Sequence, residues 1–477
     1  MVFALFAAPL VAGLVALAAP WRRAVAWLGA LAAGIVLALG IALAARVEAS
    51  GPLNDGVLRV DALGAFMVIV IGAVSVLATV RSVSYLTDDV ASGHSTRRHA
   101  ARYSMLVQAF IATMLLAVVA NNVGVLWVAI EATTVVTTFL VGHHRTPSAL
   151  EASWKYIIIC SVGIAIAFLG TVLVYLAGVH AHLASPLDLT TLVAHAGQLN
   201  APVVRVAFTL LVLGYGTKAG LVPLFSWLPD AHGQAPAPVS ALMSGVLLSV
   251  ALSAILRLRV VAVGALGPTF PRVLVLVIGL ATLVVAASML LVQRDLKRML
   301  AYSTMENMGI MTVAGAVGGP LALSGVLLHV LGHGLVKGVL FLDAGEVLRL
   351  EGTTRLGALG GLLARRPAVG GLFALGLAGL VGLPPFSLFL SELTMLRAEA
   401  DAGLWWIAGA VLAVLAVVVA AMFAHARTML LGPSDASTTS PVSFVVPLGL
   451  ALGAAVCIGL VAWPLAHLIA LAARVVA

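Results

Sequence analysis

The chain has 477 residues, of which 62% are hydrophobic and 9% charged, and its formal net charge is +8. Soluble domains carry about 25% charged residues, so this composition excludes a soluble globular protein. On a soluble protein such basic charge would suggest nucleic-acid binding, but here it falls in loops between apolar runs. The two cysteines, Cys160 and Cys457, form neither a Cys-x-x-Cys motif nor a Cys/His cluster with metal-ligand spacing. We therefore expect no metal, no cofactor and no catalytic chemistry in this chain.

Fourteen continuous apolar runs are long enough to be membrane-spanning helices, which need about 20 residues each. The runs are residues 2–20, 24–45, 61–86, 103–120, 122–142, 154–178, 203–226, 236–262, 272–292, 302–317, 321–348, 368–396, 404–430 and 442–473. Their continuity disfavours a β-barrel, whose strands alternate in polarity. The first run lacks a basic segment before it, so we interpret it as a retained helix rather than a cleaved signal.

No linker or low-complexity segment divides the chain, so residues 1–477 are predicted to form one all-α integral membrane domain. Two runs contain mid-span breakers, and aligning Gly220 with Gly382 also aligns Pro223 with Pro385. Broken helices at corresponding places in two halves are typical of transport sites at a repeat interface. Because the two breaks lie five runs apart, the halves would have opposite orientations. The predicted parts are helices 1–3 (1–102), a first repeat of five helices (103–262), an inverted second repeat (272–430) and a final helix (442–473).

The basic residues are concentrated in alternate loops. The rich loops include Arg22-Arg23, Arg97-Arg98, the cluster Arg294/Lys297/Arg298, and Arg365-Arg366. The positive-inside rule makes these loops cytoplasmic and places both termini outside. Arg257, Arg259 and Arg272 fall on the poor side and run against this assignment.

Ionisable residues inside the apolar runs are the candidate functional groups. A charge at bilayer depth costs roughly 2.5–3.5 kcal/mol on insertion scales, so it usually marks an ion or proton path. Glu131 lies near the middle of run 122–142, and Lys218 precedes the break in run 203–226. Burial lowers the pKa of a lysine and a nearby carboxylate raises it again. A lysine balanced between these two effects can take up and release a proton. We hypothesise that Glu131 contacts Lys218; the alternative is a purely structural ion pair.

The run 321–348 places three ionisable residues on one helix face, because His329, His333 and Lys337 are spaced i, i+4, i+8. Histidine titrates near neutrality and suits a proton relay. Glu392 follows the second break as a candidate site residue; the alternative is a boundary residue at the end of its helix. Glu306 is expected near the start of run 302–317, where it is either a site residue or a helix cap.

The segment after the first break contains Asp230 and His232 in Leu-Pro-Asp-Ala-His-Gly, which we expect to be a loop. These two residues are candidates for a cytoplasmic proton entry. Proline and aspartate also favour turns, so turn chemistry is an equal explanation.

Three long motifs carry a family resemblance. They are Gly-Tyr-Gly-Thr-Lys-Ala-Gly-Leu-Val-Pro-Leu-Phe-Ser-Trp-Leu-Pro-Asp-Ala-His-Gly (214–233, continuing to 245), Gln-Arg-Asp-Leu-Lys-Arg-Met-Leu-Ala-Tyr-Ser-Thr-Met (293–305) and His-Gly-Leu-Val-Lys-Gly-Val-Leu-Phe-Leu (333–342). Over about residues 60–430 the chain resembles the antiporter-like membrane subunits of complex I, Mrp antiporters and group 4 hydrogenases. It resembles component F of hydrogenase-4 most. The resemblance implies fourteen helices with two inverted five-helix repeats and broken helices 7 and 12.

The resemblance also implies residue roles. Glu131 and Lys218 match the pair thought to gate proton loading, Lys337 matches a lysine of the central axis, and Glu392 matches the terminal acidic or basic position. The family's helix-8 lysine falls on Ser249, which cannot store a proton. A water chain, or the histidines of run 321–348, would have to bridge that gap, or the path is broken there.

The sequence therefore predicts a proton-translocating membrane subunit without catalytic chemistry, whose partners are other membrane subunits and a peripheral arm, in the bacterial inner membrane. Three alternatives remain open: a cation/proton antiporter subunit, a subunit energising inorganic-carbon uptake, and a structural subunit that no longer conducts. No nucleic-acid partner is expected.

Overall fold

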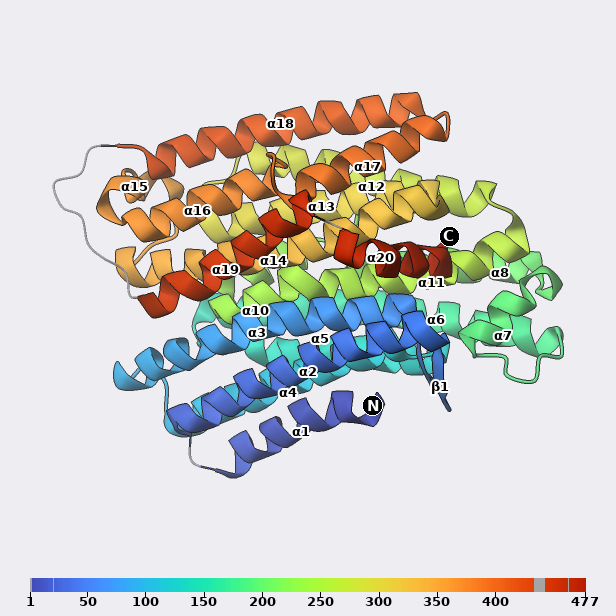
Figure 1. The fold of residues 1–477 in the computed structure, drawn as a ribbon, viewed down its shortest axis with the longest axis horizontal. Coiled ribbons are helices and arrows are strands. Elements are labelled where there is room, and N and C mark those ends of the chain that lie inside the picture. Colours follow the sequence, from blue (N-terminus) through green and yellow to red (C-terminus); the bar gives the residue numbers. More distant parts are fainter. Residues whose placement is uncertain (1, 20, 433–441, 462) are drawn as a thin grey trace.

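Long helices that run side by side make up almost all of the computed structural model, which describes residues 2–19, 21–432, 442–461 and 463–477 (Figure 1). The elements of the first half are α1 (Val2–Ala18), α2 (Arg23–Ser50), β1 (Leu53–Asp55), β2 (Leu58–Val60), α3 (Ala62–Ala91), α4 (Arg97–Val119), α5 (Val123–Val141), α6 (Pro147–His180), α7 (Leu189–Ala194), α8 (Ala201–Lys218), α9 (Trp227–Gln234) and α10 (Ala237–Leu242). Those of the second half are α11 (Leu248–Leu266), α12 (Thr269–Leu291), α13 (Leu296–Val317), α14 (Gly319–Glu351), α15 (Leu362–Arg365), α16 (Pro367–Leu380), α17 (Ser387–Asp401), α18 (Trp405–Leu430), α19 (Val442–Leu460) and α20 (Trp463–Val476). A π-helical turn (Met243–Leu247) joins α10 to α11.

Each predicted apolar run overlaps a helix or a helix pair, and residues 20 and 462 of these runs lie outside the described residues. Among the described residues, nine helices are long and apolar enough to cross a membrane, or ten if the bent pair α19–α20 is one span. The count of fourteen spans therefore stays a prediction. The expected single final helix (442–473) is wrong, because the chain bends between α19 and α20.

Polar side chains fix several helix starts. Asp61 accepts a hydrogen bond from the Gly64 amide (2.8 Å), Asn122 accepts from Gly124 (3.0 Å), and Asp295 accepts from Arg298 (3.0 Å). The first amides of a helix have no partner within the helix, so such caps stabilise the start, typically by about 1 kcal/mol each.

One short hairpin departs from the all-α prediction. Leu53–Asp55 pairs antiparallel with Leu58–Val60, and Gly56 in the turn has φ 59°. The hairpin is fastened to the bundle by a bridge between Leu58 and Ala120, just before α5. Three-residue strands give too little alternation to be predicted from sequence.

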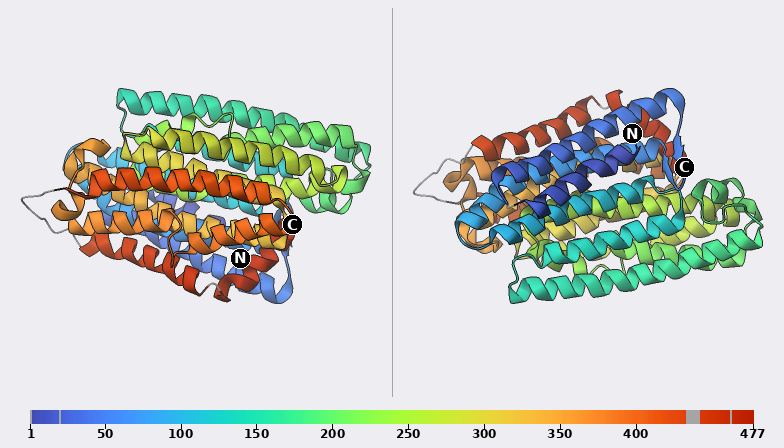
Figure 2. Two further views of the ribbon diagram at one scale, coloured as in Figure 1. Left: turned by 90° about the horizontal axis from the view of Figure 1, so that it is seen from above. Right: turned by 90° about the horizontal axis from the view of Figure 1, so that it is seen from below.

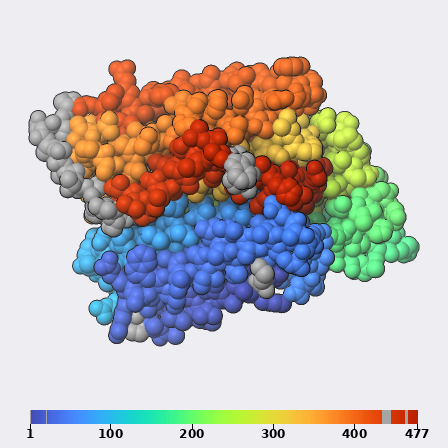
Figure 3. Space-filling view, in the orientation of Figure 1, coloured from blue at the N-terminus to red at the C-terminus, as the bar shows by residue number. Residues whose placement is uncertain are grey.

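Helix α14 lies in the middle of the bundle, where its central residues are buried. It packs against α3, α13, α16, α17, α19 and α20. The C-terminal helices α19 and α20 lie between the N-terminal helices and the α16–α18 group (Figures 1 and 3). Helix α6 forms an outer edge of the bundle (Figure 2). The ionisable side chains in the middle of α14, from His329 to Asp343, are thus completely buried.

The two predicted helix breaks are confirmed. Helix α8 ends at Lys218 and α9 begins at Trp227, while α16 ends at Leu380 and α17 begins at Ser387. Each break contains a glycine in the left-handed region, Gly220 (φ 73°) and Gly382 (φ 67°), followed three residues later by a proline with a cis peptide bond. The inverted relation between the two five-helix groups stays a prediction.

Candidate functional site

Lys218 is the last residue of α8, and its side chain is completely buried where the break opens. Its ammonium group donates to Thr134 Oγ1 (2.9 Å) and to the Tyr156 hydroxyl (2.5 Å). Tyr156 also shares a hydrogen bond with Thr137 (2.5 Å). Helices α5, α6 and α8 thus each contribute to one polar group, which we call the Lys218 group (Thr134, Thr137, Tyr156 and Lys218).

A close approach of α6 and α8 makes this group possible. A Cβ on Gly163 would lie 2.5 Å from Thr217 Cβ, and a Cβ on Gly214 would lie 2.5 Å from the Gly163 carbonyl oxygen. Only glycine allows the two backbones to approach this closely. The Lys218 ammonium therefore reaches the hydroxyl of Tyr156, which is carried by α6 seven residues before Gly163.

Glu131 lies on α5 close to the Lys218 group but does not touch its lysine. One carboxylate oxygen accepts from Ser161 Oγ (3.0 Å), and the other has no partner among the described residues. The predicted contact between Glu131 and Lys218 is wrong as a direct ion pair, because Thr134, one turn further along α5, takes that place.

Lys337 lies at the centre of α14 and is completely buried. It donates to the Leu300 carbonyl oxygen (2.7 Å) and to Ser303 Oγ. Asn307 donates through Nδ2 to the Ser303 carbonyl (2.7 Å) and to Glu306 Oε2 (2.5 Å). Helix α13 therefore links the lysine to a buried carboxylate.

His329 extends this link to the second broken helix. Its Nε2 is 2.7 Å from Asn307 Oδ1, and its Nδ1 is 2.9 Å from Ser391 Oγ. Ser391 directly precedes Glu392 on α17. A series of polar contacts, which we call the α13–α14–α17 chain, thus runs from Lys337 through Ser303, Asn307 and His329 to Ser391. Ser303 takes part with two different atoms, since its hydroxyl accepts from Lys337 and its backbone carbonyl accepts from Asn307.

The remaining residues of this region have definite places. His333 stacks on His329 with ring centroids 6.2 Å apart, and neither of its nitrogens has a partner among the described residues. Glu392 is the sixth residue of α17, not a helix end, and its carboxylate lies where a Cβ of Gly382 would be. The cap interpretation of Glu306 is wrong, because α13 begins at Leu296 and is capped by Asp295.

Asp230 and His232 lie in helix α9 and not in a loop, which corrects the prediction. Asp230 forms ion pairs with Arg298 (2.6 Å) and Lys155 (3.2 Å), so it ties α9 to α13 and α6. His232 is completely buried, with Nδ1 2.9 Å from the Leu228 carbonyl oxygen. Its Nε2 and the hydroxyl of buried Ser249 have no partner among the described residues.

The structure brings the predicted residues together in two groups and not in one row. Within the described part of the chain, no series of hydrogen bonds joins the Lys218 group to the α13–α14–α17 chain. What lies between them is mostly aromatic: Tyr156 contacts Trp227, Trp227 contacts His232, and His232 contacts Phe341.

Sequence reasoning missed the uncharged polar members of both groups, which are Thr134, Thr137, Tyr156, Ser303, Asn307 and Ser391. Their only signal in the sequence is a polar side chain within an apolar run. It also missed Asp343 on α14, which is completely buried and has no hydrogen-bond partner for either carboxylate oxygen among the described residues.

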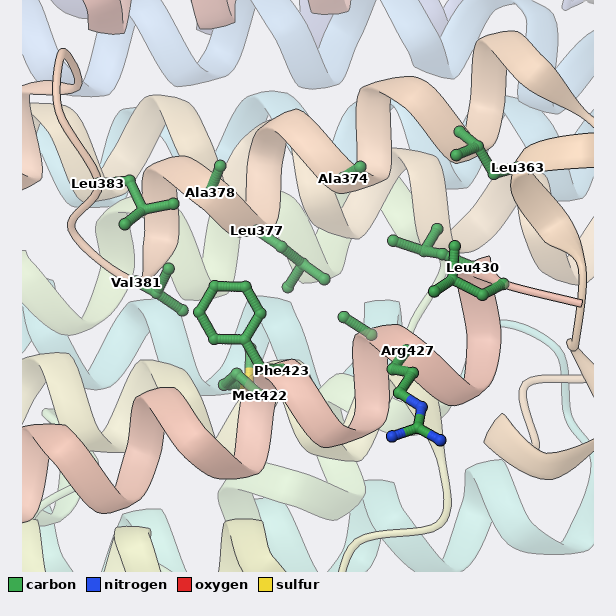
Figure 4. Close-up of a pocket in the computed structure, with 12 residues that line it drawn as sticks. Leu363, Ala374, Leu377, Ala378, Val381, Leu383, Met422, Phe423, Arg427 and Leu430 are labelled. Carbon is green, nitrogen blue, oxygen red and sulfur yellow. The ribbon is translucent and has the colours of Figure 1, made fainter.

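A groove of about 270 Å³ between α16 and α18 is not part of either group (Figure 4). Apolar side chains such as Leu377 and Phe423 line it, with Arg427 as its one charged residue, and no member of the two groups reaches it. Across the described ranges, no cluster of three His, Cys, Asp or Glu residues is arranged to hold a metal ion.

Comparisons with known proteins agree with this architecture. Residues 120–424 match the family model described as "NADH:quinone oxidoreductase/Mrp antiporter, TM". A hydrogenase-4 component F homolog from Methylacidiphilum infernorum (isolate V4) is 38% identical over 340 residues, which is 71% of each chain. A chain of an archaeal membrane-bound sulfane sulfur reductase superposes with a TM-score of 0.90 at 25% identity, covering 100% of this chain and 97% of that one. A chain of the Mrp complex from Dietzia sp. DQ12-45-1b gives 0.86 at 22% identity, with 99% and 96% covered.

Buried lysines beside two broken helices in an apolar bundle define a multi-pass, antiporter-like membrane subunit. The chain belongs to the NADH:quinone oxidoreductase/Mrp antiporter transmembrane family.

Proposed function

We propose that this chain translocates protons as one membrane subunit of a hydrogenase-4-like or complex-I-like complex. The observation that carries the proposal is the α13–α14–α17 chain, a series of buried polar contacts that leads from Lys337 to Ser391 beside Glu392. Ionisable groups that face a bundle interior mark proton relays by default. An amide oxygen can only accept, so His329 Nε2 donates to Asn307 Oδ1, and Nδ1, which lies beside Ser391 Oγ, is the nitrogen that would take up and release a proton.

Lys218 is the loading site in this proposal. Its ammonium donates to two hydroxyl groups, and Glu131 on α5 is the carboxylate that would stabilise the charged form. A change in the position or charge of Glu131 would shift the proton affinity of Lys218. Chemistry in a peripheral arm, performed by partner subunits, would drive that change, and the proton would leave past Glu392.

The test uses the whole complex reconstituted into vesicles. Lys218→Ala and Glu131→Gln should abolish proton uptake coupled to the driving reaction while the complex still assembles. Lys155→Ala is the matched control, because Lys155 is a half-exposed lysine that pairs with Glu151 and Asp230 at the surface. Uptake by either site variant at the level of the control would refute the proposal.

A cation/proton antiporter subunit is the second candidate, and the gap between the two groups favours it. Two groups without a hydrogen-bonded link could serve two different ions. Transport that depends on sodium in the same vesicles would support this function. A subunit for inorganic-carbon uptake would co-purify with a zinc-bearing soluble partner. If the chain is a structural subunit, Lys218→Ala would leave the proton uptake of the complex unchanged.

We also propose the bacterial cell membrane as its location, with both termini outside and the arginine-rich loops in the cytoplasm. The alternation of basic loops supports this orientation. Labelling of single cysteines by a membrane-impermeant reagent tests it: a cysteine at position 403 should react from outside, and one at position 93 should not.

A further inference from the structure

We propose that Glu399 is a proton-binding residue at the outer end of the path, between Glu392 and the membrane surface; the inference rests on the proton-translocating function proposed above. Glu399 lies in the last turn of α17 and is completely buried. Neither of its carboxylate oxygens has a hydrogen-bond partner among the described residues. A buried carboxylate without a hydrogen bond gains nothing that offsets its desolvation cost.

The position of Glu399 continues the path beyond Glu392. Seven residues, or two helical turns, separate them, so Glu392, Met395 and Glu399 share one face of α17. That face packs against the first half of α14, where Gly325 lies against Met395 and the Ser391 carbonyl. The same part of α17 therefore carries Ser391, Glu392 and Glu399 in the order in which a proton would meet them.

The surroundings place Glu399 at one end of the bundle. Its neighbour Ala398 packs with Val317 and Ala322 at the turn between α13 and α14, and Leu404 lies against them. Helix α17 ends two residues later at Asp401. The predicted orientation makes both of these turns external, so Glu399 is the last buried acid on α17 before the outer surface.

The nearby charges do not neutralise Glu399. Arg397 pairs with Asp401 (3.6 Å), and both side chains are exposed. The carboxyl ends of the peptide dipoles in the last helical turn also oppose a negative charge there. The neutral carboxylic acid is thus the resting form, and the ionised form exists only while the proton passes on.

The step itself is a proton transfer through water. Seven residues correspond to about 10.5 Å along the helix, which exceeds hydrogen-bond reach. Glu399, which rests as the neutral acid, would first release its proton to bulk water. Glu392 would then release its proton to a short water chain, which protonates the transient Glu399 carboxylate and restores the neutral resting form.

The experiment compares four variants in the reconstituted complex. Glu399→Gln and Glu399→Met should lower the initial rate of proton uptake at least about tenfold, or ~1.4 kcal/mol in barrier. Glu399→Asp should restore much of the rate, because it keeps a carboxyl group. Asp401→Asn is the matched control, since it removes an exposed carboxylate two residues away, and it should pump like the wild type.

The outcomes separate this inference from the function on which it rests. Wild-type vesicles that take up no protons would overturn both. Wild-type uptake that is lost in Lys218→Ala but kept in Glu399→Gln would overturn only the role of Glu399. If Glu399→Gln and Glu399→Asp both fail to assemble while Glu399→Met assembles and pumps, the residue serves packing and the inference is wrong.

Discussion

Gly163 controls the distance between α6 and α8 and hence the Lys218 group. In Gly163→Ala the new Cβ would lie 2.5 Å from Thr217 Cβ and 2.7 Å from Thr217 Cγ2. Carbon atoms in contact prefer about 3.5–4.0 Å, so the two helices must separate locally by about 1.0–1.5 Å. Overpacking of this kind costs about 1–3 kcal/mol of folding free energy.

The functional effect should exceed the effect on stability. Lys218 follows Thr217 directly, and its 2.5 Å hydrogen bond to Tyr156 crosses the interface that must widen. A shift of about 1 Å lengthens this contact beyond the roughly 3.2 Å at which hydrogen bonds fade. Misplacement of a reacting group by about 1 Å costs on the order of 100-fold in rate. We therefore expect Gly163→Ala to lose most proton uptake while the complex remains assembled.

The assay is proton uptake by vesicles, measured beside the thermal unfolding midpoint of the purified complex. Gly34→Ala on α2 is the matched control, because its Cβ would meet no atom within 4 Å. Gly163→Ala combined with Thr217→Gly should recover uptake, because the second change removes the clashing Cβ, although a helical glycine costs about 1 kcal/mol. Equal uptake by Gly163→Ala and Gly34→Ala would refute the reasoning.

Three further predictions concern other contacts. Gly382→Ala should displace the Glu392 carboxylate from the second break and lower proton uptake without loss of the driving reaction; uptake at the wild-type rate would contradict the placement. Asp61→Asn should lower stability by about 3–5 kcal/mol, because it removes the negative charge and one of the two oxygens that accept short hydrogen bonds from Arg257 (2.6 and 2.7 Å). A thermal midpoint unchanged by Asp61→Asn but lowered by Arg257→Leu would count against it. Burial raises the pKa of Asp61, but the neighbouring Arg257 outweighs burial, so the pKa of Asp61 is lowered overall. The stability that this ion pair contributes should therefore be present at neutral pH and disappear as the pH falls through the lowered pKa. Burial lowers the pKa of His143, in the α5–α6 loop, to about 3. As the pH falls below about 6.5, the histidine is protonated in the unfolded chain but not in the folded one, so stability should decrease. His143→Phe should flatten this part of the curve of thermal midpoint against pH.

The parts predictable from sequence are those that a single helix displays. Lys218 and Lys337 were found because a charge inside an apolar run is visible without any neighbour. The breaks were found because a glycine followed by a proline interrupts a helix wherever it lies. Family motifs then gave these residues roles, and the family itself is confirmed.

What could not be predicted depends on pairs of helices far apart in the chain. His329 meets Ser391 across 62 residues, and Lys218 meets Thr134 across 84 residues. Glu306 was misplaced for a related reason: Lys297 lowers the hydropathy of the first turns of α13, so these turns were not included in the predicted apolar run. In the structure Lys297 is buried, and its ammonium donates to the Ala235 carbonyl (2.7 Å), so the helix begins earlier than its apolar run.

Whether water connects the Lys218 group to the α13–α14–α17 chain decides whether this subunit conducts protons or has a structural role. His232 Nε2, both nitrogens of His333 and the hydroxyl of Ser249 are all buried, and none has a partner among the described residues. Buried polar groups are nearly always satisfied, and where protein supplies no partner, ordered water does. We therefore expect water between the Lys218 group and the α13–α14–α17 chain. This water would take the place of the family's helix-8 lysine, which is Ser249 in this chain. Water at these atoms in a high-resolution map, together with loss of uptake in His333→Leu, would support conduction; a dry interior and normal uptake in that variant would show that the two groups act separately.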